Sequence, residues 1–173
     1  GNTKRDTVQG LLDLVPAAGI TLGSSVASTS GTAITFSSIP TGTKRITVNF
    51  VGVSTSGASF PQVRLGDSGG IETSGYLGAA LGGGTAVSNF TTGFGLGGDW
   101  GATAIIHGSM ILSLVDASTF TWAGILVDTR SDGAYLSYGS GSKSLSAELT
   151  QLNITMANGS DTFDAGKINI SYE

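Results

Sequence analysis

The chain has 173 residues, 28 of them glycine and none cysteine, and its formal net charge is −4 with only 12% charged residues. This length suits one domain with an adequate core, and the lack of cysteine excludes a disulfide framework and a zinc–thiolate site. There is no basic stripe for nucleic acid and no run long enough to span a membrane, so we expect neither partner. The hydroxyl-rich composition is typical of secreted β-proteins and virion proteins.

Residues 1–19 differ from the rest of the chain. Apolar side chains recur there at helical spacing before Pro16, at Val8, Leu11, Leu12 and Val15. This spacing predicts a short N-terminal helix, and a loosely packed arm is the alternative. We interpret residues 1–19 as an arm or the remnant of a stalk, leading into one domain over residues 20–173.

From Ile20 onward the apolar residues alternate with polar ones. The stretch "KRITVNFVGV" places Ile46, Val48 and Phe50 on one face, and similar patterns occur near residues 104–115, 119–128, 144–156 and 166–173. In residues 144–156 the phase shifts, which predicts either a bulge or a strand that turns from one sheet to the other. Another strand is expected near residues 86–94. Turn clusters separate roughly nine to eleven such strands, which favours an all-β fold, an antiparallel β-sandwich or jelly roll.

Residues 66–70 read Gly-Asp-Ser-Gly-Gly, the sequence that surrounds the nucleophile of trypsin-like serine proteases. A catalytic serine needs a histidine base, and the only histidine, His107, follows Ser68 instead of preceding it. Asp, Ser and Gly are also the residues that tight turns require. We therefore interpret Ser68 as part of a hairpin turn.

Three longer segments carry a resemblance to a known family. They are "FSSIPTGTKRITVNFVGVSTSGASFPQVRLGDSGGIETSGY", "GSMILSLVDASTFTWAGILV" and "YGSGSKSLSAELTQLNITMANGSDTFDAGKINISYE". Together they resemble the tail-fibre and tail-fibre-like proteins of tailed bacteriophages and prophages. The resemblance implies a homotrimeric tip domain in the virion that joins the rest of the fibre through its N-terminus. It also implies adhesion to a bacterial surface receptor, a polysaccharide or an outer-membrane protein.

Two loops have the residue types that a glycan-binding tip uses, namely aromatic faces with polar groups beside them. The first loop, "GGDWGA", offers Asp99 and Trp100, although Trp100 could instead pack against a neighbouring subunit or the sandwich edge. The second, "VDTRSDGAYLSY", could equally be a solvated hairpin with an Asp–Arg pair. Its candidate residues are Asp128, Arg130, Asp132, Tyr135 and Tyr138. Trp122, in mid-strand, is predicted to lie in the core.

No spacing in the sequence indicates catalysis, a cofactor or a metal. If a glycosidase pair existed, Asp128 with Asp132 would be the first choice. His107 could meet its copies on a threefold axis and bind a metal, but a hydrogen-bonded strand residue is expected instead. Asp161 and Asp164 lack a calcium-loop pattern and are expected to be turn residues.

We therefore predict a non-catalytic adhesin without cofactor. Three alternatives remain: a structural virion protein (capsid decoration or baseplate), a carbohydrate-binding module and a depolymerase. Trimerisation would separate the virion proteins from the module, cell binding would identify the fibre tip, and glycan cleavage would indicate the depolymerase.

Overall fold

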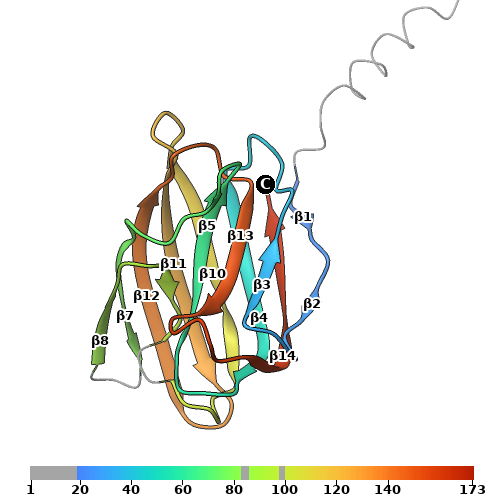
Figure 1. The fold of residues 1–173 in the computed structure, drawn as a ribbon, viewed down its shortest axis with the longest axis vertical. Helices are drawn as coiled ribbons and strands as arrows, with labels where there is room; N and C mark the ends of the chain where they lie inside the picture. The colour runs from blue at the N-terminus through green and yellow to red at the C-terminus, as the bar shows by residue number, and fades with distance from the viewer. Residues whose placement is uncertain (1–18, 83–85, 98–99) are drawn as a thin grey trace, which may run out of the picture.

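The computed structural model describes residues 19–82, 86–97 and 100–173, and these residues form two antiparallel sheets packed face to face (Figure 1). The predicted antiparallel β-sandwich is confirmed. The N-terminal helix predicted within residues 1–19 lies, apart from Gly19, outside the described residues.

The large sheet has nine strands in the order β1-β14-β4-β10-β11-β12-β7-β8, with β2 also paired to β14. Its strands are β1 (Thr21–Leu22), β2 (Val26–Ala27), β4 (Arg45–Thr55), β7 (Leu77–Gly82), β8 (Ala86–Phe90), β10 (Ile106–Asp116), β11 (Thr121–Arg130), β12 (Tyr135–Ser144) and β14 (Phe163–Tyr172).

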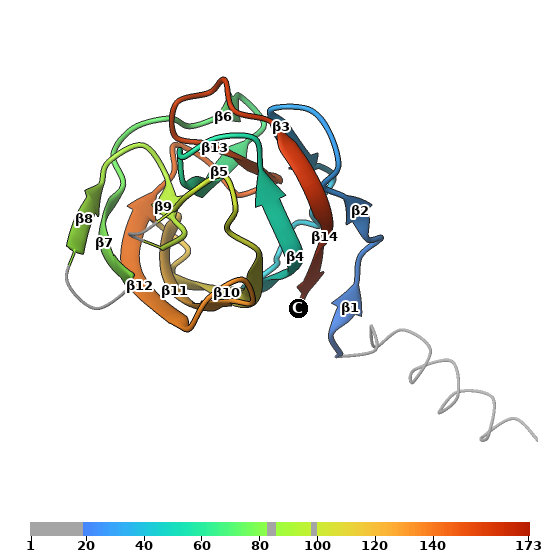
Figure 2. The same cartoon turned by 90° about the horizontal axis from the view of Figure 1, so that it is seen from below.

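The small sheet has the order β3-β13-β5-β6, with β9 also paired to β5. Its strands are β3 (Ala33–Phe36), β5 (Pro61–Asp67), β6 (Gly70–Ile71), β9 (Phe94–Gly95) and β13 (Gln151–Met156). Figure 2 shows the large sheet curving around the small one, so that one core lies between them.

The alternation of apolar residues determines which side of each strand faces this core. On β4 the side chains of Ile46, Val48 and Phe50 are fully or almost fully buried. Their neighbours on β10, such as Met110 and Leu112, are buried as well, because paired residues in a sheet point to the same face. Trp122 is 2% exposed, which confirms its predicted place in the core.

The strand registers place the two ends of the described chain at one end of the sandwich. Ile46 pairs with Tyr172 and with Leu112, and Thr21 also pairs with Tyr172. Together with the β10–β11 hairpin at residues 117–120, these residues form what we call the terminal end. Ile106 pairs with Arg130 and Val53 at the opposite end, the loop end, which holds the loops at residues 56–60, 131–134 and 157–162 (Figure 1).

Two strand predictions were wrong. Residues 145–150 form no strand, although Leu145 and Leu149 are buried, and β13 begins only at Gln151. The expected single strand near residues 86–94 is divided into β8, in the large sheet, and β9, in the small sheet. The phase shift in the first segment and Gly93 in the second mark a chain that passes from one sheet to the other.

The turn around Ser68 is confirmed. Asp67 pairs with Gly70 in the β5–β6 hairpin, and the Asp67 Oδ1 atom accepts a hydrogen bond of 2.7 Å from the Gly69 amide. His107 lies on β10 near the loop end, whereas this hairpin lies near the terminal end. Ser68 therefore has no histidine base beside it.

Candidate functional site

The β11–β12 hairpin brings three of the predicted residues into contact at the loop end. The Nη2 atom of Arg130 lies 2.5 Å from Oδ2 of Asp132, and its Nε atom donates to Oδ1 at 3.1 Å. The guanidinium carbon of Arg130 also lies 4.7 Å from the centre of the Tyr135 ring. An arginine held by a carboxylate and stacked on an aromatic ring has little freedom, so the cluster has a defined shape.

Asp132 also ties the hairpin to the strand beside it. Its Oδ1 atom accepts a hydrogen bond of 3.0 Å from the Ile105 amide, immediately before β10. The hydrogen bonds from Arg130 hold the pKa of the Asp132 carboxyl well below its usual range, so Asp132 is ionised at neutral pH. Tyr135, at 36% exposure, presents part of its ring to solvent.

The other loops at this end are polar and held by their own hydrogen bonds. The Asp161 Oδ2 atom accepts from the Ser59 amide at 3.0 Å, and the Ser59 hydroxyl accepts from the Asn158 amide at 3.0 Å. Asp161 is thus a hydrogen-bonded loop residue, and Asp164 lies on β14. Among the described residues no group of three or more His, Asp or Glu side chains is placed to hold a metal ion.

His107 also has ordinary hydrogen bonds. Its Nδ1 atom accepts from the Gly52 amide at 3.3 Å, and its Nε2 atom lies 3.3 Å from the Ser131 hydroxyl. These contacts agree with the expected hydrogen-bonded strand residue. They also fix the hairpin at residues 131–134 against β10.

Tyr138 lies away from this cluster, on the outer face of the large sheet. It is 54% exposed and pairs across the strands with Val127, which is 52% exposed. An open groove of about 320 Å³ runs along this face between β7, β11 and β12, and its lining includes Leu81, Ile125 and Val127. The exposure of these apolar residues could not be predicted from the sequence, because their pattern is that of a buried strand and a single strand does not show which of its faces is covered.

Asp128 points into the sandwich instead of toward solvent. It is 2% exposed, and neither carboxyl oxygen has a hydrogen-bond partner among the described residues. Burial raises the pKa of this carboxyl to about 6; the Ser137 hydroxyl opposite it on β12 lowers the pKa in part, although it forms no hydrogen bond of normal geometry with the carboxyl. A side chain at Gly108 would collide with Asp128, because a Cβ atom built there lies 2.6 Å from the Asp128 Cβ atom. Asp128 therefore cannot touch a receptor in this arrangement.

Asp128 and Asp132 do not form a pair of carboxylates in one cleft. The first is enclosed between the sheets, and the second is bonded to Arg130 at the hairpin tip. This placement does not match the glycosidase arrangement, in which both carboxyl groups flank the scissile bond.

Trp100 is also turned inward. It is 8% exposed, belongs to the core, and donates a hydrogen bond of 2.8 Å from its Nε1 atom to the Thr55 hydroxyl. The alternatives considered for this residue were packing against a neighbouring subunit or the sandwich edge; it lies in the core itself, and little of the ring is left for a receptor. Asp99 lies outside the described residues.

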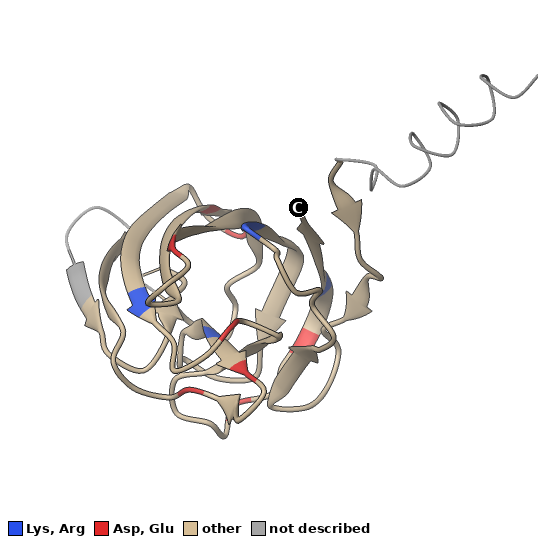
Figure 3. Ribbon diagram, turned by 90° about the horizontal axis from the view of Figure 1, so that it is seen from above, with Lys and Arg blue, Asp and Glu red and all other residues tan. Residues whose placement is uncertain are grey.

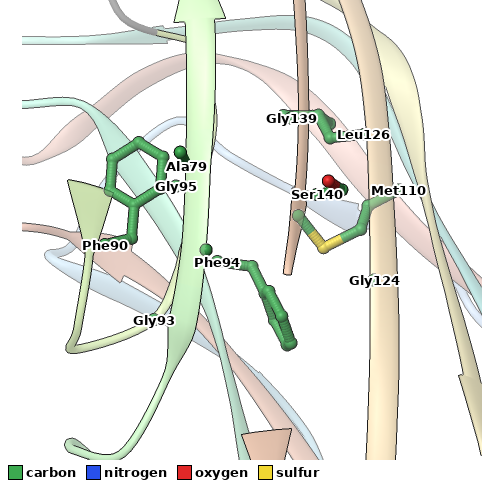
Figure 4. Close-up of a pocket in the computed structure, with 11 residues that line it drawn as sticks. Ala79, Phe90, Gly93, Phe94, Gly95, Met110, Gly124, Leu126, Gly139 and Ser140 are labelled. Atoms are coloured by element: carbon green, nitrogen blue, oxygen red, sulfur yellow. The ribbon is translucent and has the colours of Figure 1, made fainter. Parts of the chain in front are cut away.

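Other spaces occur in the described part of the molecule, among them a small enclosed cavity and a wider cleft. The cavity in Figure 4, lined by Phe90, Phe94, Met110 and several glycines, has a volume of about 10 Å³, which holds no more than one water molecule. A wider cleft of about 420 Å³ opens between β3 and the edge of the large sheet, beside Thr35, Ser37 and Leu22. Neither gathers charged side chains.

No protein-family model, curated protein or solved structure matches this chain. Within the described residues there is no helix of the length and hydrophobicity that crossing a membrane requires.

Proposed function

We propose that this protein is the receptor-binding tip domain of a bacteriophage tail fibre, which acts from the virion at the surface of the host cell. The resemblance of residues 36–76, 108–127 and 138–173 to tail-fibre proteins suggests it. The observation that carries it is the position of the Arg130–Asp132–Tyr135 cluster, at the opposite end of the sandwich from Thr21 and Glu173. A domain joined to a shaft at its terminal end would direct this cluster away from the shaft.

The chemistry of the loop end fits a polar receptor such as a surface polysaccharide. The exposed part of the Tyr135 ring can contact the apolar face of a sugar, and Arg130 fixes the orientation of that ring. Hydroxyl and amide groups also occur at the loop end, in the loops at residues 131–134 and 157–162. The proposed mechanism is adhesion without catalysis, in which three tips on one fibre multiply weak contacts through effective concentration.

The experiment measures binding of fluorescently labelled protein to a panel of intact Gram-negative cells. Selective staining of some strains is expected for the wild-type protein. Tyr135→Ala and Asp132→Asn should weaken binding to those strains by roughly tenfold or more, because each removes or releases part of the cluster.

Asp116→Asn is the matched control, since Asp116 holds the other hairpin through bonds to Ser118, at the terminal end. It should leave staining unchanged. Loss of staining in all three variants, or in none, would contradict the assignment of the receptor site to the loop end. A protein that stains no cells would favour a structural virion protein.

A further inference from the structure

The outer face of the large sheet is uncharged over four neighbouring strands. The outward positions of β7, β10, β11 and β12, all of them described, include residues such as Ala79, Ser109 and Ser140, and apart from Asp116 at the end of β10 none is Asp, Glu, Lys or Arg. The charged residues of these strands either point inward, as Lys143 does, or lie at strand ends, as Asp116 does. Figure 3 shows how few charged residues the whole domain carries and how they are scattered. We call these outward positions the uncharged face.

Five large apolar side chains stand on this face. Their exposed fractions lie between 52% and 71%, and they are Leu77, Ile125, Val127, Leu136 and Tyr138. With roughly 200 Å² for each fully exposed side chain, they present on the order of 600 Å² of mostly apolar surface. A stable interface takes about 800 Å² from each partner, so this face and the small residues around it suffice for one.

The remaining outer surfaces of the two sheets have a different character. On the small sheet the outward side chains include Arg64 and the hydrogen-bonded pair Asn153–Thr35. On the large sheet, charges begin beyond β10, with Arg45 on β4 and Lys167 on β14. The apolar surface is therefore confined to one face and bounded by polar ones.

We propose that further copies of this chain pack against the uncharged face, each copy turning this face toward a common axis. A face without charge meets its own copy without like-charge repulsion, which is the charge complementarity that self-association needs. An extended peptide cannot add to β10, β11 or β12 as a strand, because each already has a neighbour on both sides. A membrane partner is disfavoured, since no lysine or arginine of these four strands points outward to meet lipid headgroups.

This arrangement assigns a different role to Tyr138, one of the residues predicted to bind the receptor. In this inference Tyr138 packs against a neighbouring copy, while Tyr135 remains at the loop end. Copies packed side by side in parallel through this face bring their loop ends together, so the assembly would present several receptor sites in one direction. That the assembly contains three copies rests on the proposed fibre function. That the copies meet through the uncharged face rests on the exposed apolar residues of that face.

The first test compares two glutamate variants by their mass in solution over a wide range of protein concentration. Val127→Glu places a charge at the centre of the uncharged face, and Val51→Glu places one on β4, outside it, at a similarly exposed valine (52% against 48%). The wild-type protein and Val51→Glu should be trimers, and Val127→Glu should associate at least about tenfold more weakly. A wild-type monomer, or equal masses for the two variants, would overturn the inference.

The second test remains valid if Val127→Glu fails to fold. Because the chain has no cysteine, Val127→Cys and Val51→Cys each introduce a unique thiol with little change in volume. A short bis-maleimide should join Val127→Cys chains into covalent dimers and leave Val51→Cys chains single. Equal cross-linking of both, or of neither, would contradict the uncharged face as the interface. Cross-linking at position 127 in a protein that is a dimer in solution would support the uncharged face as the interface but contradict a trimeric fibre tip. Absence of cell staining would contradict only the proposed receptor-binding function.

Discussion

Asp128 makes the stability of the folded protein depend on pH in a direction opposite to that of most carboxylates. Its pKa rises from 3.8 to about 6 on folding, because the carboxyl is buried without a hydrogen-bond partner. Below pH 3.8 both states hold the proton, and Asp128 has no effect. Between pH 3.8 and 6 the unfolded chain releases the proton while the folded protein retains it, so the free energy of unfolding falls as pH rises.

The full decrease in the free energy of unfolding follows from the size of the pKa shift of Asp128. Two pKa units correspond to about 3 kcal/mol, reached above pH 6, of which about 1 to 2 kcal/mol falls between pH 5 and pH 7.5. The carboxyls of Asp67, Glu72 and Asp132 have lowered pKa values, and their contributions are lost only as pH falls toward acid. Above pH 5 these three carboxyls therefore do not change the free energy of unfolding with pH, whereas Asp128 does.

The assay is urea unfolding of the wild-type protein and Asp128→Asn at a series of pH values from 5 to 7.5. An asparagine can neither ionise nor satisfy its amide at this site, so its absolute stability carries a constant cost of about 1 to 3 kcal/mol. The difference between the two pH profiles removes that constant. We expect the wild-type protein to lose about 1 to 2 kcal/mol more than Asp128→Asn over this interval, and parallel profiles would refute the buried, unpartnered carboxyl.

Three further substitutions test the packing. Lys143 is buried in an ion pair with the more exposed Glu72. Glu72→Gln leaves the buried ammonium group unpaired and should lower the free energy of unfolding, measured in urea, by about 3 to 5 kcal/mol, whereas Lys143→Met should lower it clearly less. Equal losses for the two variants would contradict the burial of the ammonium group. Tyr76→Phe leaves a β5 amide, now bonded to the Tyr76 hydroxyl at 2.7 Å, without a partner. Its expected cost is about 1 to 3 kcal/mol by the same assay, and an unchanged stability would oppose this bond. Gly95→Ala would drive a Cβ atom into the buried Phe90 ring, and thermal unfolding should show a loss of about 1 to 3 kcal/mol; an unchanged midpoint would contradict the close packing of this ring on Gly95.

The alternation of apolar residues was sufficient to predict the long strands and the fold class. Ile46, Val48 and Phe50 alternate because only one face of β4 is buried, and that local pattern needs no knowledge of the partner strand. The turn at Ser68 was predictable for the same reason, since the hydrogen bond from the Gly69 amide to Asp67 is made within the turn itself. Local chemistry determines both features.

The candidate site was less predictable, because burial depends on how distant segments meet. Trp100 in a glycine-rich loop and Asp128 near a hairpin have the sequence surroundings of exposed residues, yet both are covered by other strands. Asp128 is accommodated because position 108, on the neighbouring strand, is glycine. The ion pair between Arg130 and Asp132 was anticipated as a simple solvated pair, and their stacking with Tyr135 depends on the hairpin geometry.

The connectivity of the large sheet also affects the order in which its strands pair during folding. Strands β10, β11 and β12 follow one another through short hairpins, whereas β14 pairs with β4 and β3 pairs with β13 only across most of the chain. Local pairings form before distant ones, because closing a long loop costs more entropy. We therefore expect the three-strand meander, which carries most of the uncharged face, to form before the sandwich closes, so that neighbouring chains could meet through it while each is still folding.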